Sequence, residues 1–463
     1  MPIFNKVVVA NRGAVAARVL RALNALGIRS LALYSDADRQ APYLALASET
    51  AHIGAAPARE SYLNQERLLE VARLHHVDAL HPGYGFLSEN AAFAQRVEDA
   101  GMRFIGPAPR WIDAMGHKTR ARELAARHGW PVGRGSDVLA RDAADVLRAA
   151  EEIGYPILVK PAAGGGGIGM LPARSPAELL EVVERAASMA ERGFASREVY
   201  LERLVERPRH VEVQVLGDRH GNVVHLYERD CSVQRRHQKI IEEAHAPALP
   251  RERLEPLLAR IGQTLSTLGY DSLGTVEMLL APDGEFRFLE MNTRLQVEHG
   301  VTEEITGIDL VQAQLRCAAG HRLAEVLPAQ VETRGHAVQA RVYAEDPKRF
   351  LPSPGTLTAF LWPTAPHVRV ETGYRAGMDV TPHYDPLLAK VIAWAPTRSE
   401  AIERLQGALS EFAIAGVRHN IPALQAILQS KEFQAGDVHT GLALQVVQRQ
   451  DNPATQAKGK AWQ

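Results

Sequence analysis

The sequence of 463 residues predicts a multidomain protein of the α/β and α+β classes. Strand and helix signals alternate over the first hundred residues, which indicates an open parallel α/β sheet in 1–115. Alternation of polar and apolar residues near 209–215 predicts a half-buried antiparallel strand and indicates an α+β domain in 116–332. Short strands recur around turns from 335 onward. We expect a mixed α/β domain in 333–447, and a disordered polar segment in 448–463, which has little to bury.

Composition excludes several classes of protein. Lys plus Arg total 53 and Asp plus Glu total 54, so no overall charge attracts nucleic acid or an anionic membrane, and we expect neither as a partner. No apolar run is long enough to span a bilayer. The two cysteines, Cys231 and Cys317, suit a reducing compartment, and the N-terminus lacks the features of a signal peptide. We therefore expect a cytoplasmic protein.

The first unit begins with a βαβ pattern. Residues 7–10 and 28–34 are predicted strands, and 14–26, rich in Ala, Leu and Arg, is a predicted helix that Gly27 ends. Further strands are expected at 77–80 and 103–105. The loop 81–90 follows a strand end, where open α/β sheets bind ligands, although an ordinary Gly/Pro connection is the alternative.

A glycine run follows the predicted strand 157–160 and its last residue, Lys160. Five of the six positions 164–169 are glycine, so the backbone can fold closely over a ligand and direct N–H groups at it. The lysine precedes the glycines, which differs from the P-loop. The run predicts a lid, within about 132–205, over phosphates that Lys160 reaches; a flexible loop without a ligand is the alternative.

A hairpin signal, 275–280 and 285–292 around Pro282-Asp283-Gly284, carries paired carboxylates. Glu277 and Glu290 lie six residues before and seven after Asp283, so we place them nearly opposite each other, with Asn292 on the face of Glu290. Such oxygens suit Mg²⁺ or Mn²⁺ with nucleotide phosphates. A solvated polar face is the alternative, disfavoured because simple alternation places two aromatic residues on the same face, Phe286 and Phe288.

Two further segments indicate an anion site. Residues 229–239 hold four cationic residues and a histidine, which predicts local anion binding or, equally, a basic surface loop. Cys231 within it has no identified base, and we interpret it as a plain cysteine. In 294–299 an arginine, a glutamine and a glutamate alternate, so a guanidinium can recognise a planar anion while a carboxylate takes a proton. We interpret His299 as structural.

Together these motifs resemble the biotin carboxylases, the ATP-grasp enzymes that carboxylate protein-bound biotin in acetyl-CoA carboxylase, an enzyme of fatty acid biosynthesis, and in its relatives. The resemblance covers about residues 3–447. It rests on the order and spacing of ten motifs: 10–13, 81–90, the glycine run, 208–212, 228–232, 234–239, 290–294, 296–299, 344–347 and 351–355.

The resemblance implies a role for each matching residue. ATP would be bound by Lys118, Lys160, Gly164, Gly165, Gly166, Gly167, Glu202, Leu204, His210, Gln234, His237, Glu277 and Glu290. Magnesium or manganese would be held by Glu277, Glu290 and Asn292. Bicarbonate would be held by Lys239, Arg294, Gln296, the Val297 amide and Glu298. Glu298 would be the general base, and Lys239, Arg294 and Arg341 would join it in catalysis. Arg341 would stabilise the enolate-like oxygen of the biotin ureido ring, and Tyr84 would lie near biotin.

Three positions depart from the family pattern: Ile168 replaces an arginine of the lid, Ala14 replaces a glutamate, and Gly300 replaces a proline. The acid–base and metal positions match, so an active enzyme is favoured. The alternatives are an ATP-grasp ligase for another carboxylic acid, which would share the lid and the hairpin, and a nucleotide-binding regulatory homologue without turnover.

The resemblance also implies partners. No lysine is flanked by methionine, as a biotin-attachment sequence requires, and we expect the chain to end before a carrier domain could fit. Biotin would therefore arrive on a separate carrier protein, with a carboxyltransferase on another chain choosing the final acceptor. The family is commonly dimeric, so we expect a homodimer.

Overall fold

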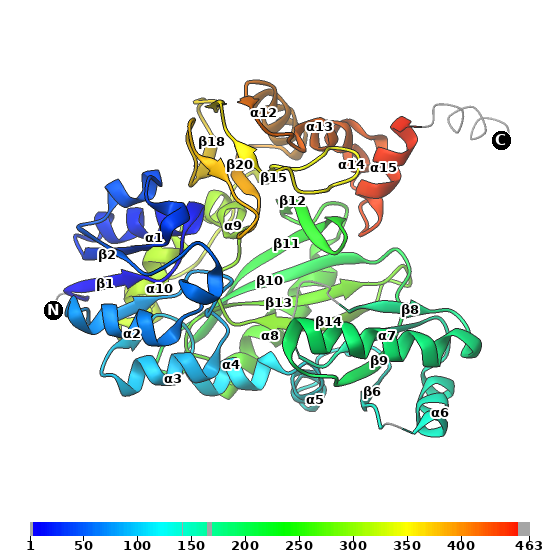
Figure 1. The fold of residues 1–463 in the computed structure, drawn as a ribbon. Helices are drawn as coiled ribbons and strands as arrows, with labels where there is room; N and C mark the ends of the chain where they lie inside the picture. Colours follow the sequence, from blue (N-terminus) through cyan, green and yellow to red (C-terminus); the bar gives the residue numbers. More distant parts are fainter. Residues whose placement is uncertain (1–2, 141, 164–168, 452–463) are drawn as a thin grey trace.

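The computed structural model describes residues 3–140, 142–163 and 169–451 (Figure 1). The first part of the chain forms a five-stranded parallel sheet in the order β3-β2-β1-β4-β5. Val7 and Val9 of β1 pack against helix α1, and Val8 packs against helices α2 and α3 on the other face. The parallel sheet is thus confirmed. Its elements are β1 (Lys6–Val9), α1 (Gly13–Ala25), β2 (Arg29–Tyr34), β3 (Glu49–His52), α2 (Gln65–Leu74), β4 (Ala79–His81), α3 (Ala91–Asp99) and β5 (Arg103–Phe104).

An antiparallel sheet of eight strands forms the middle of the molecule, in the order β14-β13-β10-β11-β12-β15-β20-β18. Because β12 pairs with β15, one sheet continues across the expected boundary at 332/333. Its strands are β10 (Arg209–Gly217), β11 (Val223–Arg235), β12 (Gln238–Ala244), β13 (Leu273–Leu280), β14 (Phe286–Asn292), β15 (His336–Tyr343), β18 (Val368–Thr372) and β20 (Leu387–Ala395).

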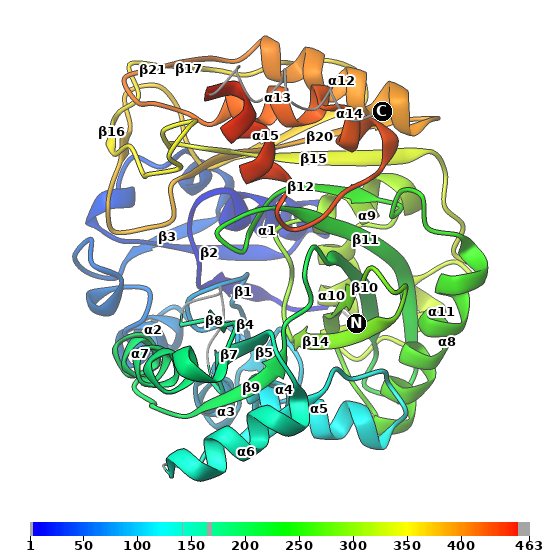
Figure 2. The same cartoon turned by 90° about the vertical axis from the view of Figure 1, so that its right-hand side faces the viewer.

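Helices cover this sheet. Helix α8 packs on the apolar side of β10 and β13, and α9 contacts β11, β12, β15 and β20. Figure 2 shows helices α12 to α15 stacked over the end of the sheet that holds β15 and β20. The helices that belong neither to the parallel sheet of the first unit nor to the lid are α4 (Pro109–Gly116), α5 (Lys118–Arg127), α8 (Arg251–Leu268), α9 (His299–Thr306), α10 (Leu310–Ala318), α11 (Leu323–Val326), α12 (Arg398–Ser410), α13 (Ile421–Gln429), α14 (Lys431–Ala435) and α15 (Leu442–Asp451).

The segment predicted to be the lid forms a sheet of its own, in the order β6-β9-β7-β8, with its own apolar core. It lies beside β14, at the lower right of Figure 1. The glycines 164–167 and Ile168 lie outside the described residues. The elements are β6 (Gly135–Val138), α6 (Ala143–Ile153), β7 (Ile157–Pro161), β8 (Leu171–Ala173), α7 (Pro176–Phe194) and β9 (Val199–Arg203).

The C-terminal region differs from one expectation. Helix α15 runs to Asp451, so the prediction of disorder from 448 onward is wrong for 448–451, while 452–463 lie outside the described residues. Two small pairs of strands complete the region: β16 (Gly355–Thr356) with β19 (Asp379–Val380), and β17 (Ala359–Leu361) with β21 (Ala413–Ala415). No helix within the described ranges is long and apolar enough to cross a membrane.

Candidate active site

A cavity of about 820 Å³ is lined by residues of the lid sheet, the eight-stranded sheet and the segment 439–441. It brings together every predicted site residue within the described ranges except Tyr84. The glycines 164–167 lie outside the described residues. Those that line it are Lys118, Lys160, Glu202, Leu204, His210, Gln234, His237, Lys239, Glu277, Glu290, Asn292, Arg294, Gln296, Val297, Glu298 and Arg341. Its volume suits a bound nucleotide.

The carboxylates of the hairpin lie as predicted: Glu277 pairs directly with Glu290 in the register of β13 and β14. A β-bulge then shifts the register, so Met278 pairs with Phe288. Phe288 therefore lies on the opposite face from Glu290, in the apolar core. The prediction that Phe286 and Phe288 share the face of Glu290 is wrong, because the extra residue inverts the alternation.

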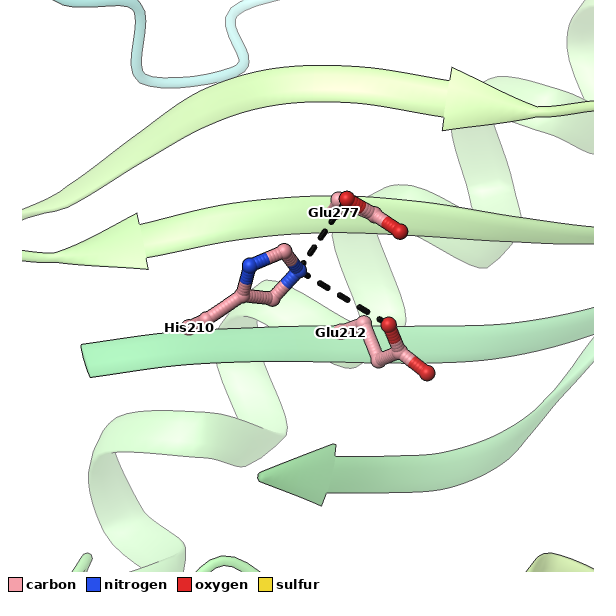
Figure 3. A group of neighbouring side chains, drawn as sticks. All are labelled: His210, Glu212 and Glu277. Atoms are coloured by element: carbon pink, nitrogen blue, oxygen red, sulfur yellow. Dashed lines mark ion pairs between the residues drawn. The ribbon is translucent and has the colours of Figure 1, made fainter. Parts of the chain in front are cut away.

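The polar face of β10 is also more buried than predicted. Along this strand Glu212 and Gln214 are wholly buried, and so are Val211, Val213 and Val215 on the other side. The prediction of a half-buried strand is wrong, because ion pairs and hydrogen bonds cover the polar face. Figure 3 shows that His210 and Glu212 project from β10 toward Glu277 of β13, with His210 Nε2 3.0 Å from Glu277 Oε2.

Lys239 is at the centre of this polar layer. Its Nζ lies 2.6 Å from Glu212 Oε2, 2.7 Å from Glu277 Oε1 and 2.8 Å from Glu298 Oε1. Burial alone would lower the pKa of Lys239, but the three carboxylates outweigh it and hold the pKa well above its ordinary value. The ammonium therefore stays charged and offsets the electrostatic repulsion among three buried carboxylates.

Glu298 is held between two cations at the N-terminus of α9. Its Oε1 accepts from Lys239, and its Oε2 accepts from Arg341 Nη2 at 3.0 Å. Burial would raise the pKa of Glu298, yet the charges of Lys239, Arg341 and Arg229 lower it well below the usual range. The site thus presents an ionised carboxylate between two cations.

Arg294 is oriented by three partners beside this pair. Its guanidinium donates to Glu89 Oε2 at 2.7 Å, to Asn292 Oδ1 at 2.9 Å and to Gln296 Oε1 at 3.0 Å. Glu89 comes from the loop 81–90, so this loop does reach the site. Its contribution is an acidic residue that sequence reasoning missed, although the loop itself was a candidate.

At the lid end, Lys160 and Lys118 each meet a carboxylate. Lys160 is almost wholly buried, and its Nζ lies 2.9 Å from Glu202 Oε2. Arg122 pairs with the other oxygen of Glu202 at 2.5 Å, a partner that sequence reasoning missed. Lys118 pairs with Glu290. Two lysines therefore reach the cavity from the side of the lid, as binding of phosphates requires.

The remaining predicted nucleotide residues also line the cavity. Gln234 Nε2 lies 3.0 Å from His210 Nδ1, and the Leu204 N–H donates to the Pro156 carbonyl at 2.9 Å. His237, at the tip of the β11–β12 hairpin, is exposed. Apolar side chains that suit an aromatic base line the cavity as well: Leu158, Met170, Leu279 and Leu289.

The basic segment 229–239 divides into structural and site residues. Arg229 is wholly buried and donates to Glu212 Oε1 at 2.6 Å and to Gln214 Oε1 at 2.7 Å. Arg235 pairs with Glu345. The interpretation of the whole segment as an anion site, or as a surface loop, is therefore wrong for these arginines. Burial raises the pKa of the Cys231 thiol well above its ordinary value, which agrees with a plain cysteine.

Tyr84, Ala14 and Gly300 are not among the residues that line the cavity, and Ile168 lies outside the described residues. Tyr84 packs, half-buried, against the neighbouring apolar core. Ala14 is buried in the first turn of α1. At Gly300, in the first turn of α9, an ideal Cβ would lie 2.4 Å from Ile392 Cδ1. Ile392 therefore occupies the space that a side chain at position 300 would need.

His439 is a cavity residue that sequence reasoning missed. It is 5% exposed, lines the cavity, and its Nδ1 accepts from the Gly441 N–H at 3.1 Å. A histidine in a polar turn far beyond the hairpin carries no periodic signal, and only the fold brings it to the site.

The predicted metal residues fit a hard divalent cation by their chemistry. Glu277 and Glu290 face each other across the hairpin, and Asn292 Nδ2 lies 2.8 Å from Glu277 Oε1. Carboxylate and amide oxygens are the donors that Mg²⁺ and Mn²⁺ prefer. Lys239 pairs with Glu277 and Lys118 pairs with Glu290, so each carboxylate of the hairpin has a cationic partner.

A separate lid sheet, two lysines facing carboxylates and an acidic hairpin define an ATP-grasp enzyme. The family models agree: residues 3–112 match the biotin carboxylase N-terminal domain, 117–326 the ATP-binding domain of the carbamoyl-phosphate synthase L chain, and 339–444 the biotin carboxylase C-terminal domain. This chain belongs to the biotin carboxylase family, and it is an ATP-dependent ligase.

Individual relatives extend over nearly the whole chain. Biotin carboxylase 2 of Bacillus subtilis is 47% identical over 441 residues, covering 94% of this chain and 98% of the relative. The biotin carboxylase of Haemophilus influenzae is 47% identical, covering 93% and 96%. Among solved structures, the biotin carboxylase domain dimer of Hydrogenobacter thermophilus 2-oxoglutarate carboxylase, with MgADP, ADP and bicarbonate, has a TM-score of 0.92 at 42% identity, covering 97% and 98%.

Proposed function

We propose that the chain carboxylates biotin on a separate carrier protein, using ATP and bicarbonate through carboxyphosphate. The observation that carries the proposal is Glu298, whose two carboxylate oxygens contact Lys239 and Arg341. The same cavity is lined by Lys118 and Lys160. A proton acceptor flanked by cations and a phosphate-binding end therefore share one chamber.

The first step is phosphorylation of bicarbonate. Bicarbonate binds between Lys239, Arg294, Gln296 and the Val297 amide, and Glu298 takes its proton. The oxygen so activated attacks the γ-phosphorus of ATP, the bond to the ADP oxygen breaks, and carboxyphosphate forms. An anion bound beside Lys239 and Arg294 offsets part of the positive charge that lowers the pKa of Glu298. Binding of bicarbonate therefore raises the proton affinity of Glu298.

The second step transfers the carboxyl group. Carboxyphosphate separates into CO₂ and phosphate, the phosphate trianion removes the proton of biotin N1′, and N1′ attacks CO₂. Arg341 stabilises the developing negative charge on the ureido oxygen, and Tyr84 lies near biotin. The lid, with the glycines 164–167, excludes water that would hydrolyse the intermediate.

The proposed nucleotide site includes Glu202, Leu204, His210, Gln234 and His237. Glu277, Glu290 and Asn292 hold Mg²⁺ or Mn²⁺, which when bound neutralises charge on the nucleotide phosphates. The unit boundaries at about 115 and 332, with a lid at about 132–205, remain our proposal for the domain organisation.

The proposed partners are a biotin carrier and a carboxyltransferase on other chains, in the cytoplasm, with the chain itself a homodimer. A relative from Methanothermobacter thermautotrophicus, 44% identical over 438 residues, is named as one of the subunits of a pyruvate carboxylase. Acetyl-CoA carboxylation in fatty acid biosynthesis is one setting, and partner chains decide the acceptor.

Affinity purification of the tagged chain is expected to recover a biotinylated protein; recovery of none would contradict this proposal.

The decisive experiment measures ADP release with Mg²⁺-ATP, with and without bicarbonate and free biotin. We expect turnover that depends on bicarbonate and increases with biotin. ATP binding without bicarbonate-dependent turnover would instead support a regulatory homologue, and turnover with another carboxylic acid would support a different ligase. The residues Ile168, Ala14 and Gly300 are the features that favour the regulatory alternative.

A further inference from the structure

The turn that precedes α9 is held from its buried side by two side chains. His299 Nδ1 lies 2.7 Å from the Gln296 carbonyl oxygen, and Lys390 Nζ donates to the Val297 carbonyl oxygen at 2.8 Å. Both side chains are wholly buried, and neither lines the cavity. Two consecutive peptide groups of the turn are therefore bound on the side away from the cavity.

Peptide geometry converts these contacts into an orientation. In a planar trans peptide the C=O and the N–H point in opposite directions. The Gln296 carbonyl points at His299, so the Val297 N–H of the same peptide points away from it. The Val297 carbonyl points at Lys390, so the Glu298 N–H points away as well. The two N–H groups are thus directed toward the side on which Gln296, Val297 and Glu298 line the cavity.

The protonation of His299 agrees with this role. Burial lowers the pKa of His299 to about 4, so the ring is neutral at physiological pH and carries one proton. Because Nδ1 faces a carbonyl oxygen, the proton is on Nδ1, and Nε2, which has no hydrogen-bond partner among the described residues, is the bare nitrogen. The neutral ring can therefore act as a donor toward Gln296.

Lys390 is itself held by a buried ionic network. Its Nζ lies 2.5 Å from Glu371 Oε2, and Glu371 pairs with Arg369. Arg369 reaches Glu303 of α9 at 2.7 Å, and Arg18 of α1 reaches the same Glu303 at 2.7 Å. The network connects α1, α9, β18 and β20, so the position of the lysine is fixed by four elements.

We infer that Lys390 and His299 are positioning residues for the anion pocket: they turn the Val297 and Glu298 amides toward bicarbonate and fix the backbone that carries the base. The inference rests on the proposed function, because it deepens the account of the same pocket. It assigns these residues no contact with substrate, so their loss acts through the bicarbonate site and leaves the ATP site intact.

The first test uses Lys390→Met beside the double variant Lys390→Met/Glu371→Gln. In the single variant the carboxylate of Glu371 loses its lysine partner. The double variant also removes this negative charge, and the amide oxygen introduced by Glu371→Gln can still accept a hydrogen bond from Arg369. We expect both variants to raise KM for bicarbonate about 10- to 100-fold, which corresponds to the loss of one charge-assisted hydrogen bond. KM for ATP should stay within about twofold of that of the unaltered enzyme. Restoration of the bicarbonate KM by Glu371→Gln would overturn the inference, because the defect would then be the unpaired charge.

The second test exchanges the donor at position 299. His299→Phe removes the donor and is expected to raise KM for bicarbonate, whereas His299→Asn keeps an N–H near the place of Nδ1 and is expected to recover most of the affinity. Equal values for the two variants, at equal thermal stability, would overturn the inference. Failure of the proposed function is distinguishable, because the unaltered enzyme would then show no bicarbonate-dependent ADP release.

Discussion

At the scale of single residues, the site is organised around one ammonium. Lys239 contacts three carboxylates, and Arg341 is held by Glu242 at 2.5 Å as well as by Glu298. Glu242 is wholly buried beneath the pocket. Buried carboxylates therefore hold both cations at the positions from which, in the proposed mechanism, Lys239 contacts bicarbonate and Arg341 contacts the ureido oxygen of biotin.

Glu298→Gln tests the base. Glutamine keeps the shape of the side chain and loses its proton affinity, so we expect bicarbonate-dependent ADP release to fall about 10²- to 10⁴-fold, the usual contribution of a general base. Binding of ATP should change little, because Lys118 and Lys160 remain. The measurement is steady-state ADP release together with nucleotide binding.

Cys317→Ser supplies the control for that variant. Cys317 is buried in α10 and does not line the cavity, so its turnover should equal that of the unaltered enzyme. A Glu298→Gln enzyme that turns over as fast as this control would show that another group accepts the proton.

At the scale of elements, Gly300 and Ile392 form a complementary pair between α9 and β20. A methyl group at 300 would overlap Ile392 Cδ1, which is buried and must move. We expect Gly300→Ala to lower the free energy of unfolding by about 1–3 kcal/mol, the usual cost of overpacking. Adding Ile392→Val, which removes Cδ1, should relieve most of this loss. Thermal and urea denaturation of the single and double variants measure the coupling.

Gly407→Ala is the matched control for this pair. Gly407 lies inside α12, and an ideal Cβ there meets no atom within 4 Å. We expect this variant to gain about 0.5–1 kcal/mol, because alanine is the better helix former. If Gly300→Ala proved as stable as Gly407→Ala, the proposed overlap with Ile392 would be wrong.

The hairpin shows how much of the site the sequence could predict. The turn Pro282-Asp283-Gly284 and the distances from it are local, so the pairing of Glu277 with Glu290 followed directly. The bulge was not predictable, because nothing in 286–290 marks which residue is extra. One unpaired residue was enough to move Phe286 and Phe288 to the other face.

Long-range partners were the other gap. Arg122, Glu89 and His439 reach the site from distant segments, and each is an ordinary polar residue in its own surroundings. Arg229 had a strong local signal but the wrong interpretation, because its buried partner Glu212 lies on a neighbouring strand. Patterns predicted strands and turns well, whereas pairings between distant polar residues depend on the complete fold.

At the scale of the whole molecule, the first unit contributes no residue to the lining of the cavity but is joined to the units that form it by buried charges. The lining runs from Lys118 to Gly441, and the network of Arg18, Glu303 and Glu371 joins the first helix to α9 and β18. Global stability and the geometry of the site therefore share the same buried charges. Conditions that change those charges should affect the whole fold.

Acid should destabilise the protein in two stages, the first of which comes from buried histidines. Burial lowers the pKa of His81 to about 3 and of His299 to about 4. In the unfolded chain both titrate near 6.5, so below that pH the unfolded state binds protons that the folded state refuses. The free energy of unfolding therefore falls as the pH drops from about 6.5 to about 4. The carboxylates Glu228 and Glu303, with pKa values lowered to about 2, add a second loss below about 4.5.

His81→Asn isolates one part of the first stage. His81 Nδ1 accepts from the Gly83 N–H at 3.0 Å, and an asparagine oxygen can accept the same bond without titrating. We expect the urea midpoint of His81→Asn to depend less on pH between 6.5 and 4 than that of the unaltered protein, since each unit of pKa difference removed is worth about 1.4 kcal/mol. His383→Asn, at an exposed ring, should keep the original slope. Equal slopes for the two variants would mean that His81 takes up its proton in the folded state, and the loss between pH 6.5 and 4 would then have to come from His299.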